Sequence, residues 1–159
     1  MTRVLAGIIV LALGCAVWFG IETSSLQPDD NAALVDQAET AQVSQEVGDA
    51  VKSVFSYDYA DLSRTERAAA AVLTGDAVKQ YRDQFITARQ RATDAKLVRT
   101  TTIRALGVRT LHGDDASLLL FLDQQTLGPS GPPQSSVAQL SVTAKRVDGH
   151  WKLASLTAL

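Results

Sequence analysis

The chain has 159 residues, a formal net charge of −2 and a single cysteine, Cys15. This length suits one small domain with its own core, and one thiol excludes an intramolecular disulfide and a cysteine-rich metal site. The charge is unevenly placed: residues 22–61 hold nine acids against one base, a net of −8, whereas residues 62–159 hold thirteen bases against eight acids, a net of +5.

The first element is an uncharged apolar run from Val4 to Ile21. A helix over these residues is about 27 Å long, close to the ~30 Å hydrocarbon core of a bilayer. A cleaved secretory signal has a shorter apolar core, of about 7–15 residues. A lipoprotein signal at Gly14-Cys15 normally has a small residue where Leu13 stands. The run therefore predicts an uncleaved transmembrane signal-anchor helix over 4–21, with lipidation of Cys15 and a buried core helix as alternatives.

The charges on either side of this run predict its orientation. Arg3 precedes it, whereas every charged residue that follows it is acidic until the first base, Lys52. Basic residues favour the cytoplasmic side of a membrane. We therefore expect residues 1–3 to form a short cytoplasmic tail, and the C-terminal domain of this single-pass protein to lie outside the plasma membrane.

Residues 22–50 are predicted to form a linker and a stalk helix. Apolar residues at three-to-four-residue spacing predict one helix over 31–55, with Asp29 or Asp30 as its cap. Its first half is rich in alanine, so we expect that half to be a stalk and only the second half to pack against the domain.

Residues 51–159 are predicted to form the extracytoplasmic domain. Ser63 and Glu66 have the spacing of a capping box, which predicts a helix that ends near Leu73. A second helix is expected from Asp76 to about Lys96.

From residue 97 the apolar period changes from helical to two, which is typical of strands. A bulge is expected near Ala105–Gly107, and the run Leu118–Leu122 predicts a central strand covered on both faces. Asp148-Gly149 is a two-residue hairpin signal. The expected strands are 97–111, 116–126, 137–147 and 150–157. Helices followed by antiparallel strands predict an α+β domain, and this order is that of the NTF2-like cone: about three helices packed on a curved, mostly antiparallel sheet of about four strands.

Such a cone commonly encloses a pocket, whose candidate side chains here are Tyr57, Tyr59, Tyr81 and Asp123. Burial at the end of an apolar strand would raise the pKa of Asp123, as proton-transfer catalysis requires, although strand-end aspartates are usually exposed. The tyrosines are interpreted as core-wall residues whose hydroxyls reach the rim. The two histidines fall at turns without a third ligand at a recognisable spacing. We therefore expect no enzymatic activity, no metal and no other cofactor.

Basic residues gather in the second predicted helix and the strand after it: Arg82, Arg89, Arg91, Lys96 and Arg99. They form either solvated helix and strand faces or a surface that binds an acidic protein partner or lipid headgroups. Nucleic acid is not expected as a partner, because no aromatic residues are interleaved with these bases.

Several segments occur in an order that resembles one family. They are the N-terminal span, Phe55-Ser56-Tyr57-Asp58-Tyr59, Thr74-Gly75-Asp76 with Tyr81, Gly107-Val108, Phe121-Leu122-Asp123-Gln124 and the stretch from Arg146 to Leu153. Together they resemble the Mce-associated membrane proteins of mycobacteria and related actinobacteria, over nearly the whole chain. Pro132-Pro133, within a longer loop, departs from the pattern.

The resemblance implies an accessory role rather than a catalytic one. Members of that family are understood as non-enzymatic subunits or stabilisers of Mce transporters, which import lipids such as fatty acids or sterols across the cell envelope. Their domain is similar to that of VirB8-like secretion scaffolds. The resemblance assigns no catalytic residue; it implies helix-end packing for Tyr57 and Tyr59, a turn at Asp148-Gly149 and a core position for Trp151.

The hypothesis that follows is an accessory membrane protein of an Mce-type lipid-import complex. Its partners would be Mce transporter subunits or other membrane proteins, with the lipid bilayer contacted through residues 4–21. Two alternatives are a lipid- or sterol-binding module that uses the cone pocket and a VirB8-like secretion scaffold.

Overall fold

The computed structural model describes residues 31–34 and 36–159, and the compact unit runs from Asn31 to Leu159. The predicted cytoplasmic tail, the predicted anchor over 4–21 and the linker up to residue 30 lie outside the described residues. Within the described part, no helix combines the length and the apolar character needed to cross a membrane.

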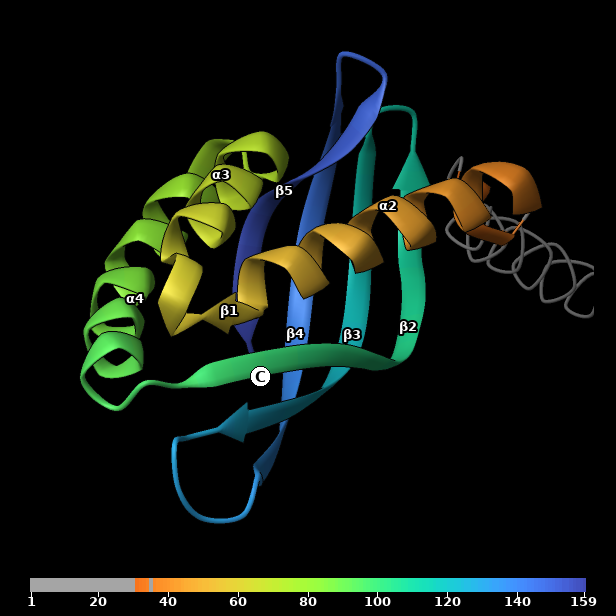
Figure 1. The fold of residues 1–159 in the computed structure, drawn as a ribbon. Helices are drawn as coiled ribbons and strands as arrows, with labels where there is room; N and C mark the ends of the chain where they lie inside the picture. The colour runs from red at the N-terminus through yellow and green to blue at the C-terminus, as the bar shows by residue number, and fades with distance from the viewer. Residues whose placement is uncertain (1–30, 35) are drawn as a thin grey trace, which may run out of the picture. The chain divides into compact units, whose positions relative to one another are not determined.

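One layer of the unit is an antiparallel sheet whose strands are adjacent in chain order (Figure 1). The strands are β1 (Tyr57–Asp58), β2 (Val98–His112), β3 (Asp115–Leu127), β4 (Gln134–Val147) and β5 (His150–Ala158). The sheet has five strands instead of the expected four, because Tyr57 and Asp58 pair with Arg99 and Val98. The predicted α+β class is confirmed.

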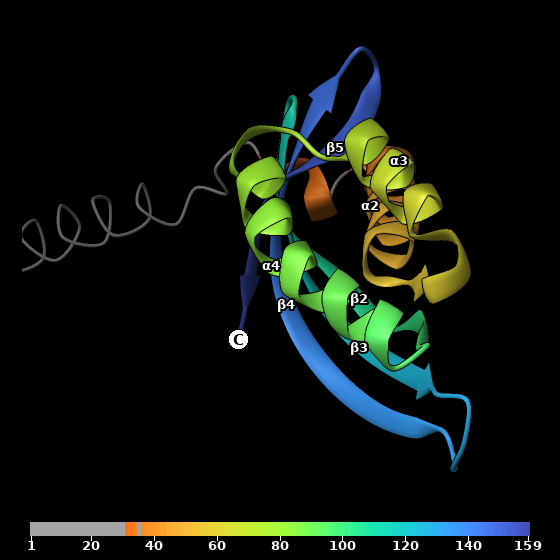
Figure 2. The same cartoon turned by 60° about the vertical axis from the view of Figure 1, so that its left-hand side comes forward.

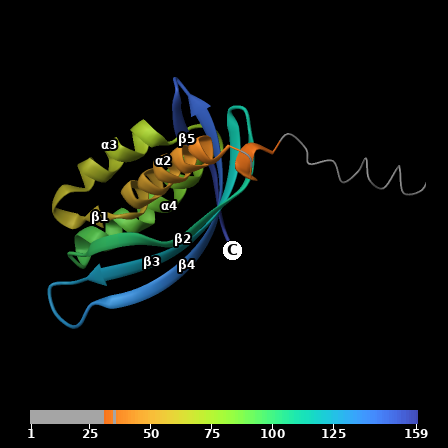
Figure 3. The ribbon, with the colours of Figure 1, turned by 90° about the vertical axis from the view of Figure 1, so that its right-hand side faces the viewer.

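The second layer consists of three helices, α2 (Gln37–Phe55), α3 (Leu62–Val72) and α4 (Gly75–Asp94). All three lie on the same side of the curved sheet (Figure 3). α2 runs across the strands, whereas α3 and α4 lie beside β5 (Figure 1). The predicted set of about three helices on one curved antiparallel sheet is therefore present.

Aspartates cap two of these helices, at positions other than those predicted. Asp36 accepts the Glu39 N–H at 2.9 Å and is the N-cap of α2, which the 3-10 turn η1 (Ala32–Leu34) precedes. The predicted caps, Asp29 and Asp30, lie outside the described residues. Asp61 begins α3 by accepting the Arg64 N–H at 3.1 Å. Ser63 is not the cap because its hydroxyl donates to the same Asp61 carboxylate, at 2.6 Å.

The core forms where one face of α2 packs on the concave face of the sheet. Val43, Val47 and Val51 of α2 are fully buried and belong to the same cluster as Leu118 and Leu120 of β3. Val43 and Val47 fall within residues 22–50, which the sequence assigned to linker and stalk. The described part of that stretch therefore packs into the domain core, because its valines continue the apolar stripe of α2 toward the N-terminus.

The convex face of the sheet has a different environment from the concave one. Along β3, Leu118, Leu120 and Leu122 are buried, whereas Leu119 is half-buried and Phe121 is 36% exposed. The expectation that this central strand is covered on both faces is therefore wrong, because α2, α3 and α4 all lie on one side (Figure 3).

Two register shifts bend β2. They fall between Ile103 and Ala105 and between Val108 and Thr110, so that Arg104 and Arg109 have no partner residue on β3. The single bulge predicted near Ala105–Gly107 is thus replaced by two bulges that flank that segment. Each bulge increases the local twist and bend of a strand, and the curvature of the sheet is visible in Figure 2.

The β4–β5 hairpin is fastened to α2 by charged groups. Its turn, Asp148-Gly149, has φ angles of 55° and 80°, as a tight two-residue turn requires. Beside the turn, Arg146 pairs with Glu39 of α2, and its guanidinium carbon lies 4.7 Å from the centroid of the Trp151 ring. Glu46 of α2 accepts the backbone N–H of Trp151 at 2.7 Å. Trp151 is 3% exposed, which agrees with its expected core position.

Side-chain amides satisfy backbone groups at both edges of the sheet. Asn31 donates to the Arg109 carbonyl at 3.0 Å and accepts the Leu111 N–H at 2.9 Å on β2. At the other edge, Gln80 of α4 accepts the Leu156 N–H of β5 at 2.8 Å. Such contacts protect edge strands from pairing with another chain.

Because the core lies on one side of the sheet, truncation of adjacent residues of β3 should lower the free energy of unfolding by different amounts. Leu120→Ala should lower the free energy of unfolding by about 2–5 kcal/mol, because it opens a cavity in the core. Phe121→Ala should cost less than about 1.5 kcal/mol, because that side chain already contacts water. Urea denaturation followed by circular dichroism measures both, and equal losses would contradict a core confined to the concave face.

The Glu46 contacts predict a pH dependence of stability. Burial raises the pKa of Glu46, but the Trp151 N–H, the Gln42 amide and the positive charges of His150 and Arg146 outweigh burial and hold this pKa below 4.5. A lowered pKa stabilises the fold above the unfolded value, and this stability is lost as the pH falls. Glu46→Gln should therefore lower the free energy of unfolding at pH 7 by about 1 kcal/mol.

The difference between wild type and Glu46→Gln should shrink as the pH falls below about 4.5 in urea titrations. Asp49→Asn is the control, because its pair with Lys52 is exposed and contributes little at any pH. A Glu46→Gln deficit that stays constant down to about pH 3 would contradict this account of the carboxylate.

Candidate functional site

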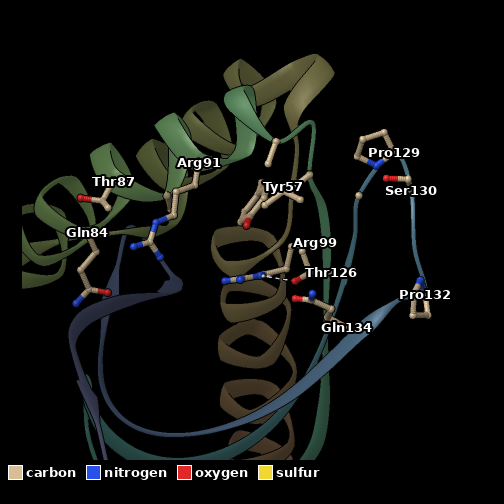
Figure 4. A pocket seen from close by; sticks show the side chains of 14 residues that line it. Tyr57, Gln84, Thr87, Arg91, Arg99, Thr126, Pro129, Ser130, Pro132 and Gln134 are labelled. Carbon is tan, nitrogen blue, oxygen red and sulfur yellow. Dashed lines mark hydrogen bonds between the residues drawn. The ribbon is translucent and has the colours of Figure 1, made fainter.

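Two surface hollows flank α4. The first, called here the α4–β2 cleft, has a volume of about 610 Å³ and lies between α4, the start of β2 and the loop from Gly128 to Pro132 (Figure 4). Its polar lining residues are Tyr57, Gln84, Thr87, Arg91, Arg99, Thr126, Ser130 and Gln134. No acidic residue lines this cleft.

Two guanidinium groups point into the cleft from different elements, Arg91 from α4 and Arg99 from β2 (Figure 4). Arg99 donates through Nε to the Thr126 hydroxyl at 3.1 Å, and its guanidinium carbon lies 5.2 Å from the centroid of the Tyr57 ring. Both contacts orient Arg99 while leaving its terminal nitrogens for other acceptors. Among the described residues, neither arginine pairs with a carboxylate.

The second hollow, called here the α3–α4 groove, has a volume of about 480 Å³ and an apolar floor. Tyr81 and Phe85 stack within it, with ring centroids 4.8 Å apart. Val78 and Ile86 of α4 also line it and are 39% and 65% exposed. Arg82 and Arg89 lie at this groove too, and Arg89 pairs with Glu66 of α3 at 2.7 Å.

Four of the five basic residues predicted as one surface therefore separate into two groups. Arg82 and Arg89 belong to the groove, and Arg91 and Arg99 belong to the cleft. At about 100° per residue, side chains two positions apart on a helix point roughly 200° apart, so Arg89 and Arg91 face different sides of α4. Lys96 lies in neither hollow; it follows α4 with a φ of 49°.

The four predicted pocket residues are not brought together. Tyr57 lines the cleft, Tyr81 lines the groove, and Tyr59 is 40% exposed in the 3-10 turn η2 (Tyr59–Asp61). Asp123 sits elsewhere on the sheet and forms an ion pair with Arg104 at 3.0 Å. Its side chain is 41% exposed, so Asp123 is not the buried acid that the strand-end position could have provided.

Acidic, histidine and cysteine side chains do not gather in groups of three or more that could hold a metal ion within the described part of the chain. The chemistry that the two hollows offer is recognition: the cleft presents cationic and neutral hydrogen-bond donors, and the groove presents apolar surface beside arginines.

The cleft includes residues that sequence reasoning missed, namely Gln84, Thr87, Thr126, Ser130 and Gln134. Gln84, Thr87 and Arg91 could have been grouped from helical periodicity, since spacings of three and four place them on one side of α4. Thr126 and Gln134 carry no local signal, because the pairing of β2, β3 and β4 brings them to the cleft.

No known family profile matches the chain. The uncharacterized protein Rv1362c of Mycobacterium tuberculosis is 28% identical over an alignment that covers 94% of this chain and 67% of that protein. The uncharacterized protein MT1407, from another strain of the same species, has the same identity and coverage. The chain is thus a distant homologue of mycobacterial proteins.

Several solved structures have a similar fold, and one of them is a secretion-system protein. An IcmL-like type IV secretion system protein from Legionella pneumophila superposes with a TM-score of 0.67 at 11% identity, covering 75% of this chain and 91% of that one. The periplasmic domain of DotI gives 0.66 at 15% identity, covering 77% and 96%. VirB8 of Agrobacterium tumefaciens gives 0.62 at 12% identity, covering 76% and 92%. The domain therefore has a VirB8-like α+β fold.

The environment of Tyr81 in the α3–α4 groove predicts that removing its hydroxyl does not destabilise the domain. Its hydroxyl is buried and has no hydrogen-bond partner among the described residues. Burial, and after it the nearby charge of Glu66, raises the pKa of this hydroxyl. Because an unpaired buried hydroxyl is unfavourable, Tyr81→Phe should leave the free energy of unfolding unchanged or raise it by up to about 1 kcal/mol.

Thr65→Val provides the matched control in denaturant titrations. Thr65 is 5% exposed, and its hydroxyl donates to the Ser56 carbonyl at 3.1 Å, so its removal should lower the free energy of unfolding by about 1 kcal/mol. A loss at Tyr81→Phe as large as that at Thr65→Val would show that the tyrosine hydroxyl has a partner.

Proposed function

We propose that the protein is a non-enzymatic accessory subunit that stabilises an Mce-type lipid-import complex in the plasma membrane. Its domain acts outside the membrane through contacts with transporter subunits, and residues 4–21 anchor it in the bilayer. Three lines support this proposal: the apolar N-terminal run, the distant mycobacterial homologues and a fold that resembles the periplasmic domain of DotI.

The observation that carries the proposal is the filled interior beneath α2. Val43, Val47 and Val51 occupy the concave face of the sheet together with Leu118 and Leu120, all of them fully buried. A sterol or acyl chain bound at this place would have to displace them. Binding a lipid in the centre of the cone is therefore the weaker alternative, and contacts through the outer surface are favoured.

The α3–α4 groove is the surface that fits a protein partner best. Val78 and Ile86 place exposed apolar side chains along one side of α4, above the stacked rings of Tyr81 and Phe85. Arg82 and Arg89 lie beside them. An amphipathic helix of a transporter subunit, with an apolar stripe and flanking acidic residues, complements both features.

A VirB8-like secretion scaffold is the second candidate function, favoured by the fold shared with an IcmL-like type IV secretion protein and with VirB8. The two candidates differ in their partners. Secretion-system subunits would be recovered with a scaffold, whereas a permease, an ATPase and Mce proteins would be recovered with the accessory subunit.

Co-purification from native membranes tests the proposal. A tagged full-length chain should recover Mce transporter subunits, and deletion of the gene should lower the amounts of those subunits. Ile86→Glu should reduce the recovery about tenfold or more, because it places a charge in the apolar groove. Quantitative mass spectrometry of the purified material provides the measurement.

Gln139→Glu is the matched control, because it adds the same charge at an exposed position on β4. It should leave the recovery unchanged, and circular dichroism checks that both variants fold. Recovery of no Mce subunit, together with unchanged subunit amounts after deletion, would disprove the proposed function. Equal recovery with both variants would instead exclude only the α3–α4 groove as the contact surface.

A further inference from the structure

We propose that the α4–β2 cleft binds the phosphate group of a small polar phosphate ester, held between Arg91 and Arg99. This inference goes beyond the accessory role, because the groove that would contact a protein partner lies at a different set of residues on α4. Soluble phosphate esters and phospholipid headgroups both carry the tetrahedral oxyanion that this site would bind.

The charge in the cleft selects an anion. Arg91 and Arg99 point into it from two elements (Figure 4), and none of the residues that line it is acidic. The groove differs in this respect, because Glu66 there pairs with Arg89. Neither guanidinium pairs with a carboxylate of the described residues. Two such groups that face the same space bind phosphate oxygens through charge-assisted, often bidentate hydrogen bonds.

Arg99 is held ready for such a ligand. Its Nε donates to the Thr126 hydroxyl at 3.1 Å, and its guanidinium lies over the Tyr57 ring, which is 9% exposed and therefore well fixed. Ordering a long side chain before binding reduces the entropy that binding would otherwise cost. The terminal nitrogens of Arg99 stay available to the ligand.

The remaining lining favours a compact polar ligand over an acidic helix. Gln84 and Thr87 on α4 and Ser130 and Gln134 across the cleft supply neutral hydrogen-bonding groups. The volume of about 610 Å³ falls within the usual range of small-ligand sites, about 300–1,000 Å³. An acidic protein segment would need buried apolar anchors, which the groove offers and this polar cleft does not.

Titration of the full-length chain in a neutral detergent tests the inference. Glycerol 3-phosphate should shift the Nε–Hε signals of arginine in nuclear magnetic resonance spectra, with saturable binding that weakens as salt is added. Arg91→Gln with Arg99→Gln should weaken binding at least about tenfold, because it removes both charged donors. The single variant Arg91→Gln leaves the Tyr57 and Thr126 contacts intact, and it should show a smaller loss in the same direction.

Charge-matched controls separate the cleft from general electrostatics. Arg67→Gln with Arg109→Gln removes two exposed bases that line neither hollow, and binding should change less than about twofold. Equal weakening in both double variants would overturn the inference, as would no saturable binding by the wild type. Tighter binding of a glutamate-rich peptide than of glycerol 3-phosphate would also overturn it and would assign the cleft to a protein partner.

Two further ligands distinguish the sources of the phosphate. Short-chain phosphatidylglycerol carries an anionic headgroup, and short-chain phosphatidylcholine carries a neutralised one. Binding of phosphatidylglycerol but not phosphatidylcholine, lost in the Arg91→Gln, Arg99→Gln variant, supports the inference and assigns the source to a lipid headgroup. Binding of glycerol 3-phosphate alone supports it with a soluble ester as the source. Neither result depends on recovery of Mce subunits, so this inference and the proposed function can fail separately.

Discussion

The packing of α2 on the concave face of the sheet is the interaction on which the rest of the domain depends. Val43, Val47 and Val51 recur every four residues, which places them on one face of the helix, and all three are fully buried in the same core cluster as leucines of β3. Each such side chain contributes roughly 1.5–3 kcal/mol when it leaves water. Because these contacts join residues far apart in the chain, the helix and the sheet hold each other in place.

This packing also determines where polar contacts form. With α2 across the sheet, Glu39 and Glu46 come beside the β4–β5 hairpin, where they meet Arg146 and the Trp151 N–H. Asn31, which precedes α2, reaches the edge of β2. These contacts add geometric specificity to a nonpolar interface that alone would tolerate small shifts of the helix along the sheet.

The sequence predicted the features that depend on local pattern, including the α+β class, the helical period of α4 and the Asp148-Gly149 turn. It failed where the outcome depends on contacts between distant segments. β1 exists because Tyr57 meets Arg99, and no pattern in two residues signals a strand. Two bulges in β2 shift the register by one residue each. Counting residue pairs outward from the turn between β2 and β3 places Thr126 opposite Arg99 only if both register shifts are known. The full set of residues that line the cleft could therefore not be grouped from the sequence.

A domain whose interior is filled by its own side chains must recognise other molecules at its surface, and helix geometry explains how α4 can offer two different surfaces. Val78, Arg82, Ile86 and Arg89 follow one another at spacings of three or four, as do Gln84, Thr87 and Arg91. At 3.6 residues per turn, these two sets lie on nearly opposite sides of the helix. The residues between them include Ala77 and Ala92, both fully buried, whose small side chains let α4 approach its neighbours closely. One helix thus separates an apolar groove from a cationic cleft, so that a partner at the first need not compete with an anion at the second.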